Sequence, residues 1–195
     1  MKFILLSMVL LQAYFLNAQV RMSDQERNLR ATGDFTAFLK EVKTNSKENC
    51  LCLQNEWVIF SFQTDSKKTA SLCISKKIGV AEGYMTYYFG TKKKIEFSYP
   101  ADTVNSFSKF SFFFYMRGGG KQNEAMELNK LNFSNKNFTY TLYDDYYSED
   151  KSHQKGITIT NDSTGKKVFI KAKGKTTGNL NRFREKNIVM AREEE

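Results

Sequence analysis

The feature that most constrains the fold is a series of short apolar segments separated by turn-forming clusters, running from Cys50 to Ala172. Several segments alternate apolar and polar residues, as strands do when one face is buried. No helical pattern separates them, so the crossover elements that parallel strands require are missing. We therefore predict about nine antiparallel strands, over residues 57–63, 69–75, 84–89, 95–99, 107–116, 126–133, 138–143, 156–160 and 167–172.

One of these segments is apolar on both faces, because Phe112, Phe113, Phe114 and Tyr115 follow one another directly. Such a strand needs cover on both sides. We predict an all-β fold in which an antiparallel meander rolls into a barrel, with a two-sheet sandwich as the alternative. Between residues 126 and 133 the apolar phase slips by one position, which indicates a β-bulge.

A single short helix is expected ahead of the strands, over residues 34–43. Asp34 is a suitable N-cap, and the apolar residues after it, at 35, 38, 39 and 42, have helical spacing. We expect this stripe to pack on the sheet; a helix that binds a partner is the alternative interpretation.

The N-terminus predicts export. Lys2 is followed by an apolar run and then by Ala18, a pattern typical of a signal peptide cleaved after residue 18. The run is shorter than the roughly 20 residues that span a bilayer, and no second run of membrane length follows. We predict a periplasmic or secreted protein without a transmembrane segment after cleavage: a signal peptide (1–18), a leader containing the helix (19–48), a β domain (49–180) and a charged C-terminal tail (181–195).

The composition limits the chemistry that this domain can carry. The 17 Phe and 10 Tyr exceed what a disordered chain contains, and we expect them to fill a β core rather than to stack on nucleic acid. The net charge of +9 favours anionic partners, such as acidic protein surfaces. His153 is the only histidine, which excludes multi-histidine metal centres. The sequence nominates no catalytic residue, metal ligand or cofactor.

Three cysteines follow the predicted signal peptide, in a compartment where disulfides form. A bond between Cys50 and Cys52 would strain the backbone, so Cys73 is expected to pair with one of them. We name Cys50–Cys73 as the candidate bond. The loop that it closes would stabilise the fold by about 3–4 kcal/mol.

Two segments are candidate binding loops. The first joins three glycines to flanking cations, so that exposed amides and positive charge could hold an anion; a flexible hairpin tip is the simpler interpretation. The second is acidic and tyrosine-rich, and suits either partner recognition or a solvated loop; it lacks the ligand spacing of a calcium loop. The candidate residues are Arg117, Gly118, Gly119, Gly120 and Lys121 in the first loop, and Asp144, Asp145, Tyr146 and Tyr147 in the second.

Over residues 57–180 the order of several short motifs resembles a group of small exported bacterial proteins without an assigned activity. The motifs are Cys73, 83–90 (GYMTYYFG), 96–100 (EFSYP), 117–120 (RGGG) with Asn123, 131–133 (LNF) and 140–144 (YTLYD). The chain departs from the group at Phe62, where a Cys often stands, and at Tyr88, where an Arg does. The resemblance implies export and a β fold, and it transfers no catalytic residue.

These features together favour a non-enzymatic binding protein, of inhibitor or immunity type, that docks on another protein. A hydrolase with an unrecognised pair of carboxylates is one alternative. A carrier of lipids or small ligands is another, although Trp57 lacks the preceding Gly-x that is usual in the best-known carriers of this kind.

Overall fold

The computed structural model describes residues 33–78, 83–120, 123–184 and 188–191. The predicted signal peptide therefore lies outside the described residues. Each of the nine predicted segments contains a strand, although residues 107–109 of the fifth segment form a 3-10 helix and its strand begins at Ser111. Two very short strands follow the nine. The elements are α3 (Gly33–Val42), β1 (Glu56–Gln63), β2 (Thr69–Ser75), β3 (Met85–Thr91), β4 (Lys94–Tyr99), η1 (Ser106–Lys109), β5 (Ser111–Arg117), β6 (Met126–Asn135), β7 (Phe138–Tyr147), β8 (Ser152–Asn161), β9 (Lys167–Lys171), β10 (Thr176–Gly178), η2 (Asn181–Phe183) and β11 (Met190–Ala191).

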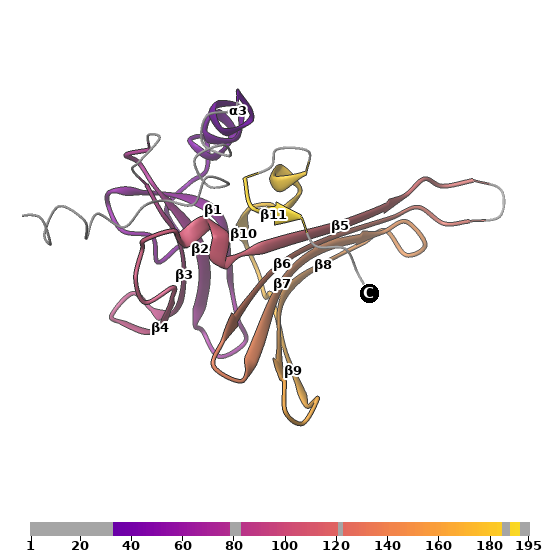
Figure 1. Cartoon of the computed structure of the whole chain (residues 1–195). Coiled ribbons are helices and arrows are strands. Elements are labelled where there is room, and N and C mark those ends of the chain that lie inside the picture. The colour runs from indigo at the N-terminus through magenta and orange to yellow at the C-terminus, as the bar shows by residue number, and fades with distance from the viewer. Residues whose placement is uncertain (1–32, 79–82, 121–122, 185–187, 192–195) are drawn as a thin grey trace, which may run out of the picture.

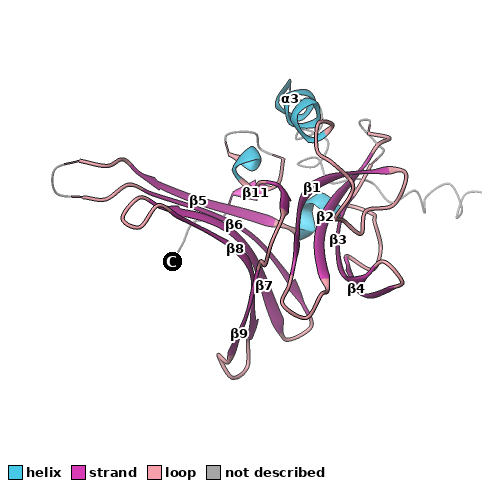
Figure 2. Cartoon of the chain, turned by 180° about the vertical axis from the view of Figure 1, so that it is seen from behind, coloured by secondary structure: helices cyan, strands magenta, loops and turns pink. Residues whose placement is uncertain are grey.

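The strands form two sheets in a sandwich-like arrangement, and the predicted closed barrel is wrong (Figures 1 and 2). Sheet A has the order β10-β1-β2-β3-β4, and sheet B has the order β11-β5-β6-β7-β8-β9. All neighbours are antiparallel except β11, which joins β5 in parallel. The meander breaks after β4, because Pro100 has no N–H for a ladder and the chain then forms η1 before β5 begins the second sheet.

Aromatic rings fill the space between the two sheets. Phe133 of β6 stacks on Tyr99 of β4 with ring centroids 4.5 Å apart, and on Tyr140 of β7 at 4.8 Å. Tyr87 of β3 lies 5.2 Å from the same ring. These contacts confirm the prediction that the rings form a β core. Each buried ring contributes about 1.5–3 kcal/mol to stability through the apolar surface that it removes from water.

The predicted helix is present, and its apolar stripe packs on the domain. Phe38 and Val42 are fully buried in the core, and the ring of Phe38 lies 5.1 Å from that of Phe183. Phe183, Ile188 and Val189 are themselves buried. The described part of residues 181–195, which the sequence assigned to a charged tail, therefore packs on the β domain.

The disulfide joins Cys52 to Cys73, and the predicted Cys50–Cys73 pairing is wrong. The segment before β1 crosses the outer face of sheet A: the Leu51 N–H donates to Ser71 Oγ at 3.0 Å, and Ser61 Oγ donates to the Asn49 carbonyl at 2.8 Å. This path brings Cys52 within bonding distance of Cys73 on β2. Cys50 is the free cysteine and is buried, with its thiol directed at the Lys47 carbonyl.

Among the described residues, α3 is the longest helix, and none of the helices there has the length and apolar character needed to cross a bilayer.

Candidate functional site

Strand β7 continues to Tyr147, so the acidic segment is not the loop that the sequence predicted. β7 and β8 pair without interruption as far as Tyr147 opposite Ser152, and the turn between them is limited to residues 148–151. Successive side chains of a strand point to opposite faces of the sheet. The four candidate residues therefore separate into two pairs: Asp144 and Tyr146 on the inner face, toward sheet A, and Asp145 and Tyr147 on the outer face.

On the inner face, Asp144 holds the chain's C-terminal segment. Its Oδ2 accepts the Leu180 N–H at 3.0 Å, and its Oδ1 lies 3.0 Å from Lys155 Nζ, with both side chains largely buried. The Lys155 ammonium also lies over the Phe60 ring of sheet A, 5.6 Å from its centroid. Asp144 is thus fully engaged in contacts within the domain.

A second polar link extends this inner network. Arg184 Nε donates to Asn129 Oδ1 at 2.7 Å, and its Nη2 lies 2.9 Å from Glu127 Oε2. Asn129 in turn donates its side-chain N–H to the Asp144 carbonyl at 2.8 Å. Since these contacts join β6, β7 and the segment after η2, the inner half of the acidic segment has a structural role.

On the outer face, Asp145 is a carboxylate with only 7% of its surface exposed. The Asn129 N–H donates to its Oδ1 at 3.1 Å. Burial raises the pKa of this carboxyl to about 6, although the Asn129 hydrogen bond and the Lys130 charge act in the opposite direction. The outer half of the acidic segment therefore carries a titratable group in a low-polarity setting.

The contact between Asn129 and Asp145 also corrects the predicted bulge in β6. The pairs Glu127–Tyr146 and Lys130–Tyr143 have the same register, so no residue is inserted between them. The two intervening positions instead lack regular ladder pairs, and the Asp145 carboxylate accepts one N–H there. Register shifts typical of bulges occur elsewhere. One lies between Val58 and Phe60 where β1 pairs with β2, and the other lies between Phe89 and Gly90 where β3 pairs with β4.

Tyrosines surround Asp145 on this face. Tyr143 and Tyr147 lie two residues away on the same strand, and burial together with the Asp145 charge raises the pKa of both hydroxyls. The neighbouring strands β6 and β5 add further large side chains at the same level. We call this surface the distal face and define it by Phe113, Tyr115, Leu128, Lys130, Tyr143, Asp145 and Tyr147.

The glycine-rich loop is a hairpin tip between β5 and β6, as the simpler interpretation predicted. The Gly120 N–H donates to the Asn123 carbonyl at 2.8 Å, and Arg117 Nε donates to the Glu124 carbonyl at 3.0 Å. Gly118, Gly119 and Gly120 do not adopt positive φ angles. These three residues therefore do not form an anion-binding nest. Lys121 lies outside the described residues.

His153 stands at the start of β8, exposed, with its ring 4.7 Å from that of Tyr146. Its ring contact is therefore with Tyr146, which lies on the inner face of β7, the strand that also carries Asp144.

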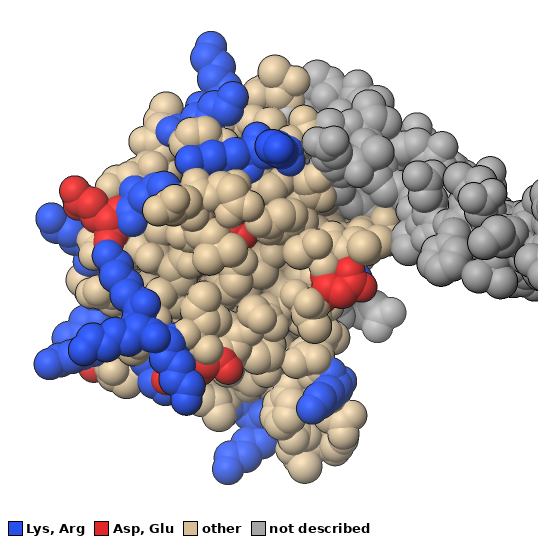
Figure 3. Space-filling view, turned by 90° about the vertical axis from the view of Figure 1, so that its left-hand side faces the viewer, with Lys and Arg blue, Asp and Glu red and all other residues tan. Residues whose placement is uncertain are grey.

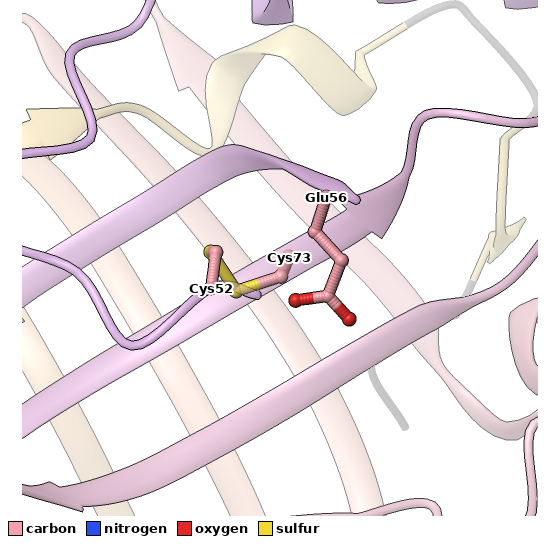
Figure 4. Close-up of side chains that lie close together, drawn as sticks. All are labelled: Cys52, Glu56 and Cys73. Atoms are coloured by element: carbon pink, nitrogen blue, oxygen red, sulfur yellow. A yellow bond between two sulfur atoms is a disulfide. The ribbon is translucent and has the colours of Figure 1, made fainter. Parts of the chain in front are cut away.

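Sequence reasoning missed one buried acid, Glu56, beside the disulfide (Figure 4). Its carboxylate accepts the Leu53 N–H at 2.7 Å and the Tyr88 hydroxyl at 2.9 Å. Burial and the neighbouring carboxylate raise the pKa of Tyr88. Potential ligand atoms of Glu56, Cys52 and Cys73 lie within 4.8 Å of one another, but the two sulfurs are bonded to each other and cannot act as thiolate ligands. The sequence signal was weak, because a Glu that begins a strand is ordinarily exposed.

Basic side chains outnumber acidic ones on the face of the molecule at the left of Figure 1, which Figure 3 views directly. The turn between β3 and β4 carries exposed Lys92 and Lys93, and exposed Lys94 begins β4. Such a surface attracts anionic groups.

Comparison of the chain with protein-family models, curated proteins and solved structures found no match. The likeness to small exported bacterial proteins therefore stays an interpretation of the sequence, and the function must be argued from the residues themselves.

Proposed function

We propose that this chain is an exported, non-enzymatic binding protein, of inhibitor or immunity type, that docks on another protein through the distal face. The observation that carries the proposal is the position of Asp145. A nearly buried carboxylate lies beside Tyr143 and Tyr147 on the outer face of sheet B, which strand alternation turns away from sheet A. Tyrosine-lined surfaces with a small number of directional polar groups are typical of protein interfaces.

The surroundings support a protein as the ligand. The Lys130 ammonium lies over the Phe113 ring, 5.7 Å from its centroid, so charge and ring surface are held together in one rigid sheet. The net charge of +9 favours approach by an acidic surface. Asp145 supplies one acceptor at the centre, which can select a partner's N–H or O–H group. The Cys52–Cys73 bond is consistent with an oxidising compartment.

The two alternatives have less support. A carboxylate-dependent hydrolase needs two acids facing one substrate, whereas Asp144 and Asp145 lie on opposite faces of β7 and Asp144 is bound to Lys155 and Leu180. A carrier needs an open interior, whereas stacked rings such as Phe133, Tyr99 and Tyr140 occupy the space between the sheets.

The test is capture of a partner by the immobilised, oxidised chain from the exported protein fraction of its source cells. We expect a stoichiometric partner, and a loss of at least about tenfold in its affinity when Tyr143 and Tyr147 are both changed to Ser. Phe169→Ser is the matched control, because Phe169 is 64% exposed on β9, at the other edge of the same sheet. Absence of any stoichiometric partner, or equal loss with the control, would contradict the proposal.

A further inference from the structure

The two sheets have four edges, and three of them are short or charged. In sheet A, β10 has only three residues, and β4 carries Lys94 and Glu96. In sheet B, β9 has the sequence KVFIK, with a lysine at each end. Short strands and edge lysines prevent a sheet from pairing with other chains. The shortness of β10 and the charged side chains of β4 and β9 therefore oppose pairing at these edges, although Val168 and Phe169 of β9 are also exposed.

The fourth edge, formed by the two-residue strand β11 and by the part of β5 that extends past it, is different. β11 pairs only with Ser111 and Phe112, and β6 occupies the other side of the strand. Within the described residues, nothing pairs with the free side of β5 from Phe113 to Arg117. Three large apolar side chains are exposed here, namely Phe114 at 43%, Tyr115 at 42% and Met116 at 62%. A long apolar edge of this kind is a template for another strand.

We propose that a second copy of this chain pairs with this edge, β5 against β5, antiparallel about a twofold axis through Tyr115. Twofold pairing is isologous, so each residue on one side of the axis meets its counterpart on the other. With Tyr115 opposite itself, Phe114 lies opposite Met116 of the second copy, and Phe113 lies opposite Arg117 of the second copy.

This register is self-complementary on both faces. On the outer face Arg117 meets a Phe113 ring, which allows a cation–π contact. On the inner face Met116 meets a Phe114 ring, and sulfur–aromatic contacts are favourable. Arg117 is the one charged side chain on the free edge, and the register keeps the two copies of it apart, so like charges do not face each other.

Neighbouring groups fit the same arrangement. Arg184 already contacts the inner side of β5, with its guanidinium 6.0 Å from the Phe114 ring centroid, and Glu127 balances its charge at 2.9 Å. The β5–β6 ribbon projects away from sheet A (Figure 1). Pairing at this ribbon therefore keeps the sheet A parts of the two basic chains apart. It also places the two distal faces side by side on one continuous sheet.

The oligomeric state of the purified, oxidised full chain tests the proposal, by sedimentation velocity over a concentration series up to about 0.5 mM. We expect a dimer of twice the chain mass, and tighter association at higher salt, because screening weakens the repulsion between two basic copies. Tyr115→Lys places two ammonium groups at the axis and should raise the dissociation constant at least about tenfold. Phe169→Lys, an equal change at the other edge of sheet B, should leave it unchanged.

Crosslinking tests the register separately. Tyr115→Cys places two thiols opposite each other and should form a covalent dimer on mild oxidation. Phe113→Cys should not, because its counterpart lies several residues away in this register.

Three outcomes would overturn the proposal. They are a monomer throughout the concentration series, an equal effect of Tyr115→Lys and Phe169→Lys, and dimerisation only after deletion of residues 192–195. The last result would show that the chain's own C-terminus occupies the edge. None of these measurements uses the partner sought in the capture experiment, so the two proposals fail independently.

Discussion

The backbone N–H of Leu180 donates to the carboxylate of Asp144 at 3.0 Å, across 36 residues of sequence. This bond fixes the start of the C-terminal segment on the inner face of sheet B, next to the ion pair between Asp144 and Lys155. A residue that looked like part of a recognition loop thus joins two distant parts of the chain.

Asp144→Ala should lower the free energy of unfolding by about 3–5 kcal/mol, because it leaves a largely buried Lys155 ammonium and the Leu180 N–H without their acceptor. Asp144→Asn keeps an acceptor for the N–H and should cost less. Urea unfolding measures both. The control is Asp65→Ala, which breaks an exposed pair with Lys173 and should lower stability much less than Asp144→Ala does, because solvent screens an exposed pair. Equal effects of Asp144→Ala and the control would contradict the assigned role.

Asp145 predicts a pH dependence of opposite sign to that of a salt-bridged acid. Its folded pKa of about 6 lies above the ordinary value of 3.8, so the folded state binds the proton more tightly than the unfolded chain does. Protonated Asp145 therefore adds its full contribution to the free energy of unfolding when the pH is below the pKa of the group in the unfolded chain. That contribution is lost as the pH rises through the pKa of the group in the folded protein.

Asp145→Asn should remove this loss, and its Oδ1 still accepts the Asn129 N–H. When the pH rises from about 4 to about 7, we expect the free energy of unfolding of the variant to increase by about 1–2 kcal/mol relative to that of the wild type. Thermal unfolding of both proteins across this range measures the difference. A difference in stability between the two proteins that does not change with pH would show that the Asp145 carboxyl titrates normally.

The disulfide assignment predicts distinct effects for the three cysteines. Cys52→Ser removes a bond that closes a separation of 21 residues and should cost about 3 kcal/mol. Cys50→Ser should cost less than about 1 kcal/mol, because a hydroxyl can also donate to the Lys47 carbonyl. Denaturant unfolding measures both changes. Thiol labelling of the unfolded, unreduced chain should modify Cys50 alone; labelling at Cys52 instead would show the other pairing.

Substitution of Gly156 tests how closely Tyr143 of the distal face packs against β8. A Cβ at this position would overlap the Ile170 carbonyl oxygen and the Tyr143 hydroxyl, so Gly156→Ala must displace a β9 carbonyl and a distal-face ring. We expect a loss of about 1–3 kcal/mol in unfolding free energy. Gly118→Ala is the control, because a Cβ there meets nothing within 4 Å. Equal stability of the two variants in denaturant would mean that Tyr143 packs less closely on β8.

The candidate site shows where local pattern stops being informative. The sequence marked residues 144–147 because acids and tyrosines stand together, yet it placed them in a loop. Polar residues in a row resemble a turn, and only cross-strand pairing with β8 extends β7 through them. The separation into a structural Asp144 and an outward Asp145 follows from that pairing and from strand alternation.

The sequence by itself determined the number and approximate positions of the nine main strands, their antiparallel class and the short helix, because these depend on local periodicity and on turn residues between neighbouring segments. Tertiary structure decided that the meander divides into two sheets, that Cys52 rather than Cys50 bonds Cys73, and that Glu56 is buried. It also decided that no strand among the described residues pairs with the outer side of β5 beyond Phe112. Each of these depends on which distant segments come together in space, and a linear pattern carries no record of contacts between residues far apart in the chain.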